Sequence, residues 1–561
     1  MASPVRPFLS LIWQVPFLRR VVLTCVALAL LSAMAEIVVA LSLVPLLASL
    51  GVGAGSEIAD FADNYPPVVW LILFALAAVF RSAANRFSTI QQERGTQELV
   101  ISLQTRLYRA LAAAHWSTIR RLTPPTITSA LQTQTYDAGY GLSGLIQLIT
   151  GGSLIFAYLI SISLVFPILL PALLLLLVAM WQVNVHRNRS VRNQSEDYYA
   201  AQTDLHQHYE DWVAISRISS LGVDASQLAD RFEARAREAA DHEVGLNRSL
   251  ALTNISYEAA MIAAILVGVP VAWWMETPPA LLAFALVALV RSLPRAGRIQ
   301  SGYQGLINAV APLLLVEELT AKIEKDAVSA PASKERLDWQ QLKLESVGIE
   351  DARREAERHW ILKDVNLEVR HGDWLAVVGP TGAGKTTLAE VLLMLLRPDR
   401  GSFYVDGVLA DDDLANRWRD QCAYVPQDVV LIDASIRDNL RLYAPDASDD
   451  ELISALDHAA ARFVVDELPD GLNTRAGPGG RWLSGGERQR IGIARALMRK
   501  PGFLLLDEPS AALDKDTQAD LMDALARLDH AMTLVLITHR PELIDLADRR
   551  ITVRQGEILT P

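Results

Sequence analysis

The chain has 561 residues, which is more than one hydrophobic core normally organises, so at least two domains are expected. Hydrophobic residues make up 51% of it and charged residues 21%, so the charge must be segregated from the apolar segments. A net charge of -12 argues against a nucleic-acid-binding protein, and two cysteines are too few for a disulfide framework or a thiolate metal cluster.

Apolar runs that are long enough to cross a bilayer occur only in the first half of the chain. Each has close to the roughly 20 residues that a membrane helix needs. The six predicted spans cover residues 21–50, 66–84, 141–165, 167–185, 254–274 and 278–293. A cleaved signal peptide over residues 1–35 is the alternative for the first span, but apolar sequence continues to Leu50 and favours a full span.

Arginines set the predicted orientation of the spans, because cytoplasmic loops carry an excess of basic residues. Arg6, Arg19 and Arg20 precede the first span, and acidic residues follow it. Long polar stretches rich in arginine follow the second and fourth spans, whereas short turns at 166–167 and 275–277 join the third span to the fourth and the fifth to the sixth. We therefore expect a multi-pass protein of the cell membrane, the inner membrane in a bacterium, with the N- and C-termini in the cytoplasm.

The second half of the chain has a different pattern. Residues 322–342 are polar and irregular, which is typical of a linker. From residue 343 onward, short β-rich runs alternate with helical patterns, as in a parallel α/β domain. The predicted fold is therefore an all-α six-helix transmembrane domain over 1–321, a linker over 322–342, and an α/β P-loop nucleotide-binding domain over 343–561.

A phosphate-binding loop follows a strand-like run and precedes a helical pattern. The motif G-x-x-x-x-G-K-[ST] and the residue after it comprise Gly379, Pro380, Thr381, Gly382, Ala383, Gly384, Lys385, Thr386 and Thr387. The glycines let the backbone curl so that N–H groups and a helix N-terminus face the phosphates. Lys385 is expected to reach the β- and γ-phosphates of ATP, and Thr386 to offer its hydroxyl to Mg²⁺. The motif thus predicts ATP and Mg²⁺ as cofactors.

Two acids end the apolar run 503–506. Asp507 is expected to lie beside the phosphate loop and to hold Mg²⁺, and Glu508 is the candidate catalytic base for the attacking water. A hydrophobic run followed by acids is also typical of an ordinary strand end. The assignment of these two acids therefore depends on the phosphate loop.

The segment Leu483-Ser484-Gly485-Gly486-Glu487 begins a predicted helix and offers a second set of exposed amides to an anion. It reproduces the LSGGE signature of the ABC transporter family, and the chain resembles that family. The resemblance implies that Ser484 and Gly486, with Gly485 and Glu487 beside them, bind the γ-phosphate of ATP held by the opposite subunit. Two anion sites in one small domain are hard to satisfy with one triphosphate, so we expect a homodimer.

The resemblance extends along the nucleotide-binding domain. Gln427 resembles the Q-loop residue, which senses Mg²⁺ and contacts the membrane domain. Asp514 resembles the D-loop aspartate, and His539 resembles the catalytic switch histidine next to the γ-phosphate. In the membrane half, the resemblance is to the exporter type of the family and implies coupling helices near 115–116 and 210–218.

Two positions depart from the family's pattern. Where the family usually has a tyrosine that stacks on adenine, the segment 347–351 ends in an acid, and Trp360 is the substitute that we expect to stack. Surface packing of Trp360 is the alternative. The segment 474–480 lacks the acidic residue that relatives often have there, so its communication with the coupling helices is expected to differ.

The expected function is that of an ABC exporter, an ATP hydrolase that moves an amphipathic substrate out of the cytoplasm. A small peptide, a lipid and a drug-like molecule all stay open as substrates, and no nucleic acid is expected as a partner. A lipid-linked oligosaccharide flippase is the alternative. An ATP-gated channel or regulator without turnover is a further one, although the presence of both Glu508 and His539 favours hydrolysis.

Glu36 is the candidate substrate residue. It lies in the middle of the first span, where an ionisable side chain is costly unless it faces a partner or a wet cavity. We expect it to contact the substrate or to couple protons. The alternative is a packing role in which Glu36 pairs with another span.

Overall fold

The computed structural model describes residues 15–49, 64–165, 225–274, 278–326, 336–351, 359–511, 515–528 and 531–559, with isolated positions outside these ranges. Internal contacts divide the chain into two units. The first comprises Met1–Ala112 with Thr123–Lys322, and the second comprises Ala113–Leu122 with Ile323–Pro561.

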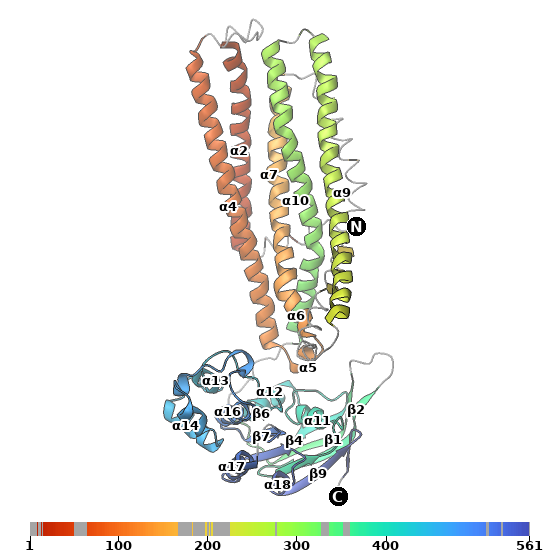
Figure 1. Ribbon diagram of the computed structural model, residues 1–561, viewed down its shortest axis with the longest axis vertical. Coiled ribbons are helices and arrows are strands. Elements are labelled where there is room, and N and C mark those ends of the chain that lie inside the picture. Colours follow the sequence, from red (N-terminus) through yellow and green to blue (C-terminus); the bar gives the residue numbers. More distant parts are fainter. Residues whose placement is uncertain are drawn as a thin grey trace. The chain divides into compact units, whose positions relative to one another are not determined.

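The first unit is built of helices and the second contains the β-sheets (Figure 1), which confirms the predicted fold class. One segment is assigned differently from the expectation. Ala113–Leu122 lies within the predicted membrane domain by sequence, but its contacts are with the second unit. The exact domain limits otherwise stay a prediction.

Long helices make up the described part of the first unit and run along the same direction in Figure 1. These elements are α2 (Pro16–Ser49), α4 (Pro67–Ala113), α6 (Pro124–Ser129), the π-helical turn η1 (Ala130–Gln134), α7 (Thr135–Val165), α9 (Ala225–Trp274) and α10 (Pro279–Lys325). The helices α2, α4, α6 and α10 each begin at a proline, because its fixed φ and missing N–H suit the first helical turn.

Three stretches of the described residues are long and apolar enough to cross a membrane. By length and composition these are Pro16–Ser49, Pro67–Ala113 and Pro124–Ala157. They overlap the first three predicted spans, 21–50, 66–84 and 141–165. The predicted fourth span, 167–185, lies outside the described residues, while the fifth, 254–274, falls at the end of α9 and the sixth, 278–293, at the start of α10.

A shared apolar core joins α2, α4, α7 and α10. Its fully buried members include Leu18, Cys25, Leu99, Leu142, Ile146, Leu306 and Leu313. Glycines bring α7 and α10 into close contact, since a Cβ atom on Gly144 would lie 2.5 Å from the carbonyl oxygen of Gly302. Small residues at such crossings let helix backbones approach each other, which is how membrane helices gain packing energy.

A buried ion pair joins α2 to α4. Glu36 is 1% exposed, and its carboxylate binds the guanidinium of Arg81. One turn away on each helix, the Ser32 hydroxyl donates a hydrogen bond to Asn85 Oδ1 at 2.8 Å. This geometry favours the packing alternative for Glu36, and the substrate role stays a prediction.

We predict that Glu36→Gln lowers the melting temperature of the purified protein, because the substitution leaves the Arg81 cation without its counter-charge in an apolar setting. Thermal unfolding in lipid nanodiscs measures the effect. Ser32→Ala, which removes one neutral hydrogen bond from the same helix pair, is the matched control and should shift the melting temperature far less. An unchanged melting temperature for Glu36→Gln, together with altered substrate stimulation of the ATPase, would instead assign Glu36 to the substrate path.

The second unit contains two sheets. The larger has the strand order β10-β9-β3-β8-β7-β6, in which only the edge strand β10 pairs antiparallel to its neighbour. The smaller sheet is antiparallel, with the order β2-β1-β4-β5. The strands are β1 (Gln341–Glu350), β2 (Trp360–Arg370), β3 (Trp374–Val378), β4 (Arg400–Val405), β5 (Val408–Leu409), β6 (Cys422–Val425), β7 (Phe503–Asp507), β8 (Thr533–Ile537), β9 (Arg549–Arg554) and β10 (Glu557–Leu559).

Helices and short turns complete the second unit. They are α5 (Trp116–Ile119), α11 (Lys385–Leu392), α12 (Asp412–Gln421), α13 (Ile436–Leu440), α14 (Asp449–His458), α15 (Arg462–Glu467), the turns η3 (Gly471–Asn473) and η4 (Pro478–Gly480), α16 (Gly485–Leu497), α17 (Lys515–Ala526) and α18 (Pro541–Ile544). In Figure 1, α13, α14 and α16 gather at one end of this unit and β1 and β2 at the other.

Both faces of the larger sheet are covered. Along β7, Phe503 and Leu505 belong to a core shared with α11 and the smaller sheet, whereas Leu504 and Leu506 belong to a core shared with α14 and α16. This division follows from the alternation of side chains along a strand. It also explains why β3, β7 and β8 are continuous buried runs, as strands of a covered parallel sheet must be.

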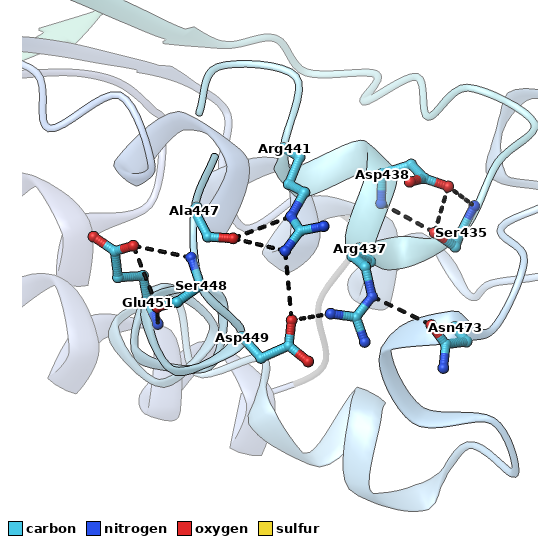
Figure 2. Close-up of polar contacts among 9 residues, drawn as sticks. All are labelled: Ser435, Arg437, Asp438, Arg441, Ala447, Ser448, Asp449, Glu451 and Asn473. Carbon is cyan, nitrogen blue, oxygen red and sulfur yellow. Dashed lines mark hydrogen bonds and ion pairs between the residues drawn. The ribbon is translucent and has the colours of Figure 1, made fainter. Parts of the chain in front are cut away.

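Reciprocal caps fix where α13 and α14 begin (Figure 2). Ser435 Oγ accepts from the Asp438 N–H at 3.0 Å, and the Asp438 carboxylate accepts from the Ser435 N–H in return. The same capping box forms at the start of α14, and an ion pair between Arg437 and Asp449 joins the two helix starts. Because each cap satisfies amides that a helix leaves open, the short helices hold a defined direction.

Candidate functional site

Several of the predicted ATP-site residues lie at one edge of the larger sheet. The phosphate loop follows β3, Asp507 ends β7, His539 follows β8, and Gln427 follows β6. Because these strands are parallel, their carboxyl ends lie at the same edge, which is where open α/β sheets bind ligands. The sheet therefore brings together residues that are up to 160 positions apart in the chain.

Backbone geometry explains the glycines of the phosphate loop. Gly382 and Gly384 have φ values of 79° and 101°, a region that residues with a side chain rarely adopt. Gly384 directly precedes α11, and a Cβ there would lie 3.0 Å from the Ile361 carbonyl oxygen. The loop thus ends at the N-terminus of α11, whose open amides favour an anion.

The Lys385 ammonium lies over the phosphate loop. Its Nζ donates to the carbonyl oxygens of Gly379 at 2.9 Å and Pro380 at 3.1 Å. Of the remaining loop residues, Thr381 and Gly382 are exposed, whereas Ala383 and Thr387 are buried. Lys385 is therefore placed where a phosphate bound by the loop amides would meet its charge.

Thr386 and Asp507 meet across the sheet edge. The Thr386 hydroxyl donates to Asp507 Oδ2 at 3.1 Å. Burial raises the pKa of the Asp507 carboxyl, and the adjacent Glu508 adds to this, while hydrogen bonds from Thr386 and Tyr424 and the charge of Lys385 oppose it. Burial also raises the pKa of the Tyr424 phenol, next to Asp507, so the phenol keeps its proton and can donate it in a hydrogen bond.

The pair Thr386 and Asp507 suits a magnesium ion. Mg²⁺ takes oxygen ligands and in ATP sites usually keeps several waters, with one or two protein groups and the phosphates. A hydroxyl and a carboxylate that already touch supply that protein contribution. Among the described residues, no cluster of three or more His, Cys, Asp or Glu side chains offers a separate metal cage.

Glu508 and His539 face each other beside this pair. His539 Nδ1 lies 3.7 Å from Glu508 Oε1. Glu508 has a left-handed φ of 48°, and its N–H donates to the Ile537 carbonyl at 2.8 Å. Such a backbone costs energy in a residue with a side chain and is most common at functional sites. The strained turn holds the carboxylate at the strand end rather than within the sheet.

The signature residues form the start of α16. Ser484 Oγ accepts from the Glu487 N–H at 3.2 Å, and Glu487 accepts from the Ser484 N–H at 2.6 Å. Gly485 and Gly486 occupy the first helical positions, whose amides have no acceptor within a helix. Helix α16 packs on α13, α14 and β6, whereas the phosphate loop leads into α11.

The remaining predicted ATP-site residues are less defined. Gln427 is exposed beyond the end of β6, and Asp514 lies outside the described residues, as does the predicted coupling helix at 210–218. Trp360 is half-buried at the start of β2, where a Cβ on Gly348 would lie 2.7 Å from its ring. Trp360 therefore packs on β1. The next residue, Ile361, lies close to Gly384 at the end of the phosphate loop.

Sequence reasoning missed two side chains of this region. Tyr424 lowers the pKa of the Asp507 carboxyl, and it lies only three residues before Gln427 in the sequence. Glu390 lies on the buried face of α11. The signal for Glu390 was an acid in an otherwise apolar helical run, which requires a partner when the helix is buried.

Three comparisons with known proteins agree with this geometry. Residues 362–511 match the family model described as ABC transporter. The chain is 33% identical over 287 residues to the ATP-dependent lipid A-core flippase of Desulfotalea psychrophila, covering 50% of this chain and 48% of the flippase. It is 29% identical over 358 residues to the multidrug resistance ABC transporter ATP-binding and permease protein of Lactococcus lactis, covering 62% of this chain and 59% of that protein. The aligned part thus spans about half the length of these curated relatives.

The fold has a solved counterpart over nearly its whole length. A bacterial Atm1-family ABC exporter with ATP bound superposes with a TM-score of 0.80 and 23% identity, covering 97% of this chain and 95% of the exporter. The helical unit and the P-loop domain together therefore define a membrane protein with a fused ATP-binding domain. Residues 362–511 are thus similar to the ABC transporter family, and the chain has the fold of an exporter-type half-transporter.

We predict that Trp360→Ala raises the Michaelis constant for ATP, because a base stacked on an aromatic ring loses about 1–3 kcal/mol when the ring is removed. Steady-state ATPase assays over a range of ATP concentrations measure it. Trp360→Phe keeps an aromatic face and should leave the constant near that of the wild type. An unchanged Michaelis constant for ATP in Trp360→Ala would show that Trp360 only packs on β1 and does not stack on adenine.

Proposed function

We propose that this protein is an ATP-driven exporter that moves an amphipathic substrate out of the cytoplasm. The observation behind this proposal is that Lys385, Thr386, Asp507 and Glu508 converge at one sheet edge of a chain that also has long apolar helices. ATP hydrolysis is the reaction that such a site supports, and the helical unit is what the reaction would drive.

Each side chain has a distinct part in the proposed hydrolysis. The loop amides and the Lys385 ammonium neutralise charge on the β- and γ-phosphates. Bound Mg²⁺, held by Thr386 and Asp507, would add positive charge at the same oxygens. Glu508 accepts a proton from the attacking water, and His539, 3.7 Å from Glu508, holds that carboxylate and the γ-phosphate in place.

A homodimer is the proposed assembly. The phosphate loop is on α11 and the signature is on α16, and these helices pack in different parts of the domain. Two copies arranged head to tail would pair the loop of one with Ser484 and Gly486 of the other. Such an arrangement gives two equivalent ATP sites, each open until the copies close.

The substrate class rests on the nature of the relatives. One is named an ATP-dependent lipid A-core flippase and another a multidrug resistance ABC transporter ATP-binding and permease protein. A lipid, a small peptide or a drug-like molecule fits this class, with a lipid-linked oligosaccharide as the flippase alternative. We place the protein in the cell membrane, the inner membrane in a bacterium, with both termini in the cytoplasm.

We predict that Glu508→Gln binds ATP but hydrolyses it at least about a hundredfold more slowly, because the amide keeps the shape of the acid and cannot accept a proton. Phosphate release and binding of a fluorescent ATP analogue, both in nanodiscs, separate the two steps. Lys385→Ala is the contrasting variant and should lose the binding itself. If Glu508→Gln hydrolysed ATP near the wild-type rate, another group would have to be the base.

A further inference from the structure

The two-residue turn that joins β9 to β10 lies against the phosphate loop. Gln555 and Gly556 form this turn, between Arg554 and Glu557, which pair with each other in the hairpin. Gly556 is buried, and its N–H donates to the carbonyl oxygen of Ala383 at 3.1 Å. A backbone hydrogen bond therefore joins the β9–β10 turn directly to the phosphate loop.

Close backbone packing keeps the β9–β10 turn in this place. A Cβ on Gly556 would lie 2.5 Å from the carbonyl oxygen of Ile361 in β2. The Gly556 carbonyl in turn accepts from the Lys363 N–H at 2.8 Å. At the start of the loop, a Cβ on Gly379 would lie 2.2 Å from the carbonyl oxygen of Val553 in β9. The hairpin, β2 and the loop thus pack backbone to backbone and leave no room for a side chain at either glycine.

The hydrogen bond to Ala383 fixes the direction of the next amide. The Ala383 carbonyl and the Gly384 N–H belong to one planar trans peptide, in which C=O and N–H point in opposite directions. Because Gly556 holds the carbonyl on one side of the loop, the Gly384 N–H points to the other side. Gly384 has a φ of 101° and, as a glycine, few conformational restrictions of its own, so the direction of its amide depends on such a contact.

We propose that Gly556 is a positioning residue for phosphate binding. The β9–β10 turn holds the peptide between Ala383 and Gly384 so that its N–H faces the phosphates of ATP. With the turn in place, the loop amides meet the anion without first being ordered, which favours binding. With the turn displaced, the peptide rotates and one donor to a charged oxygen is lost. This inference rests on the proposed function for ATP as the ligand, whereas the orientation of the loop itself does not.

A second hairpin of the same domain supplies a matched control. Asp406 and Gly407 form the turn between β4 and β5, with φ values of 50° and 77°, against 51° and 83° at Gln555 and Gly556. Both turns have the pair of positive φ values that is typical of two-residue hairpins. Gly407 is exposed, however, and a Cβ there would meet nothing within 4 Å. Gly407→Ala therefore carries the same kind of backbone strain as Gly556→Ala without disturbing the phosphate loop.

The test measures how tightly the full-length protein in lipid nanodiscs binds phosphates. Mg·ATP and Mg·tripolyphosphate, which has the phosphates but no adenine, each compete with a fluorescent ATP analogue. In Gly556→Ala, both dissociation constants should rise by the same factor, about tenfold or more, because a hydrogen bond to a charged group is lost. Gly407→Ala should change neither constant by more than about twofold. Gly556→Asn should behave like Gly556→Ala, since asparagine tolerates a left-handed φ but its Cβ still meets the Ile361 oxygen.

Hydrogen exchange tests the loop without any ligand. Amides of residues 383–388 should exchange faster in both Gly556 variants and at the wild-type rate in Gly407→Ala. Unchanged exchange in the Gly556 variants would overturn the proposal, as would unchanged tripolyphosphate binding or an equal loss in Gly407→Ala. Weaker ATP binding with normal tripolyphosphate binding would place the effect at the adenine and would also overturn it. If the wild type bound neither ligand, the proposed function would fail, while the exchange data still decided the role of Gly556.

Discussion

Parallel pairing of β3, β8, β7 and β6 is the constraint on which the ATP-binding domain depends. Because the strands run the same way, the groups after their carboxyl ends meet at one edge, and the apolar strands themselves are buried on both faces. Thr386 and Asp507 touch only because β3 and β7 each pair with β8. The strained turn at Glu508 is tolerated because the same sheet holds it at Ile537.

Buried carboxylates with cationic partners occur in both units of the chain. Glu36 binds Arg81 between α2 and α4, and Glu390 binds Arg120 from the segment Ala113–Leu122. A buried pair gains little net stability, because desolvation offsets most of the attraction, but losing one partner is costly. Such pairs therefore specify which surfaces pack together. In the first unit these are the surfaces of α2 and α4, and in the second they are the segment Ala113–Leu122 and α11.

Local motifs were readable from the sequence, and long-range partners were not. The phosphate loop, Asp507 and the signature each lie within a few consecutive residues, and their chemistry follows from that spacing. The contact between Trp116 and Glu390 joins positions 274 residues apart, so no local pattern could reveal it. Glu36 is a second example. The sequence predicted that an acid within an apolar span needs a partner or a wet cavity, but it could not decide between a substrate role and a packing role. Arg81, its partner, is 45 residues further along the chain, on a different helix.

In the proposed homodimer, each ATP site is shared by two copies of the chain. Gly486→Asp tests this sharing most directly. The change leaves the phosphate loop of its own chain intact, but its carboxylate repels a phosphate from the amides at the start of α16. Native mass spectrometry of Glu508→Gln protein after incubation with Mg·ATP counts chains and retained nucleotides. We expect two chains with two nucleotides, and none retained when Gly486→Asp is added. A single chain that retains ATP, or a double variant that retains both nucleotides, would contradict the shared site.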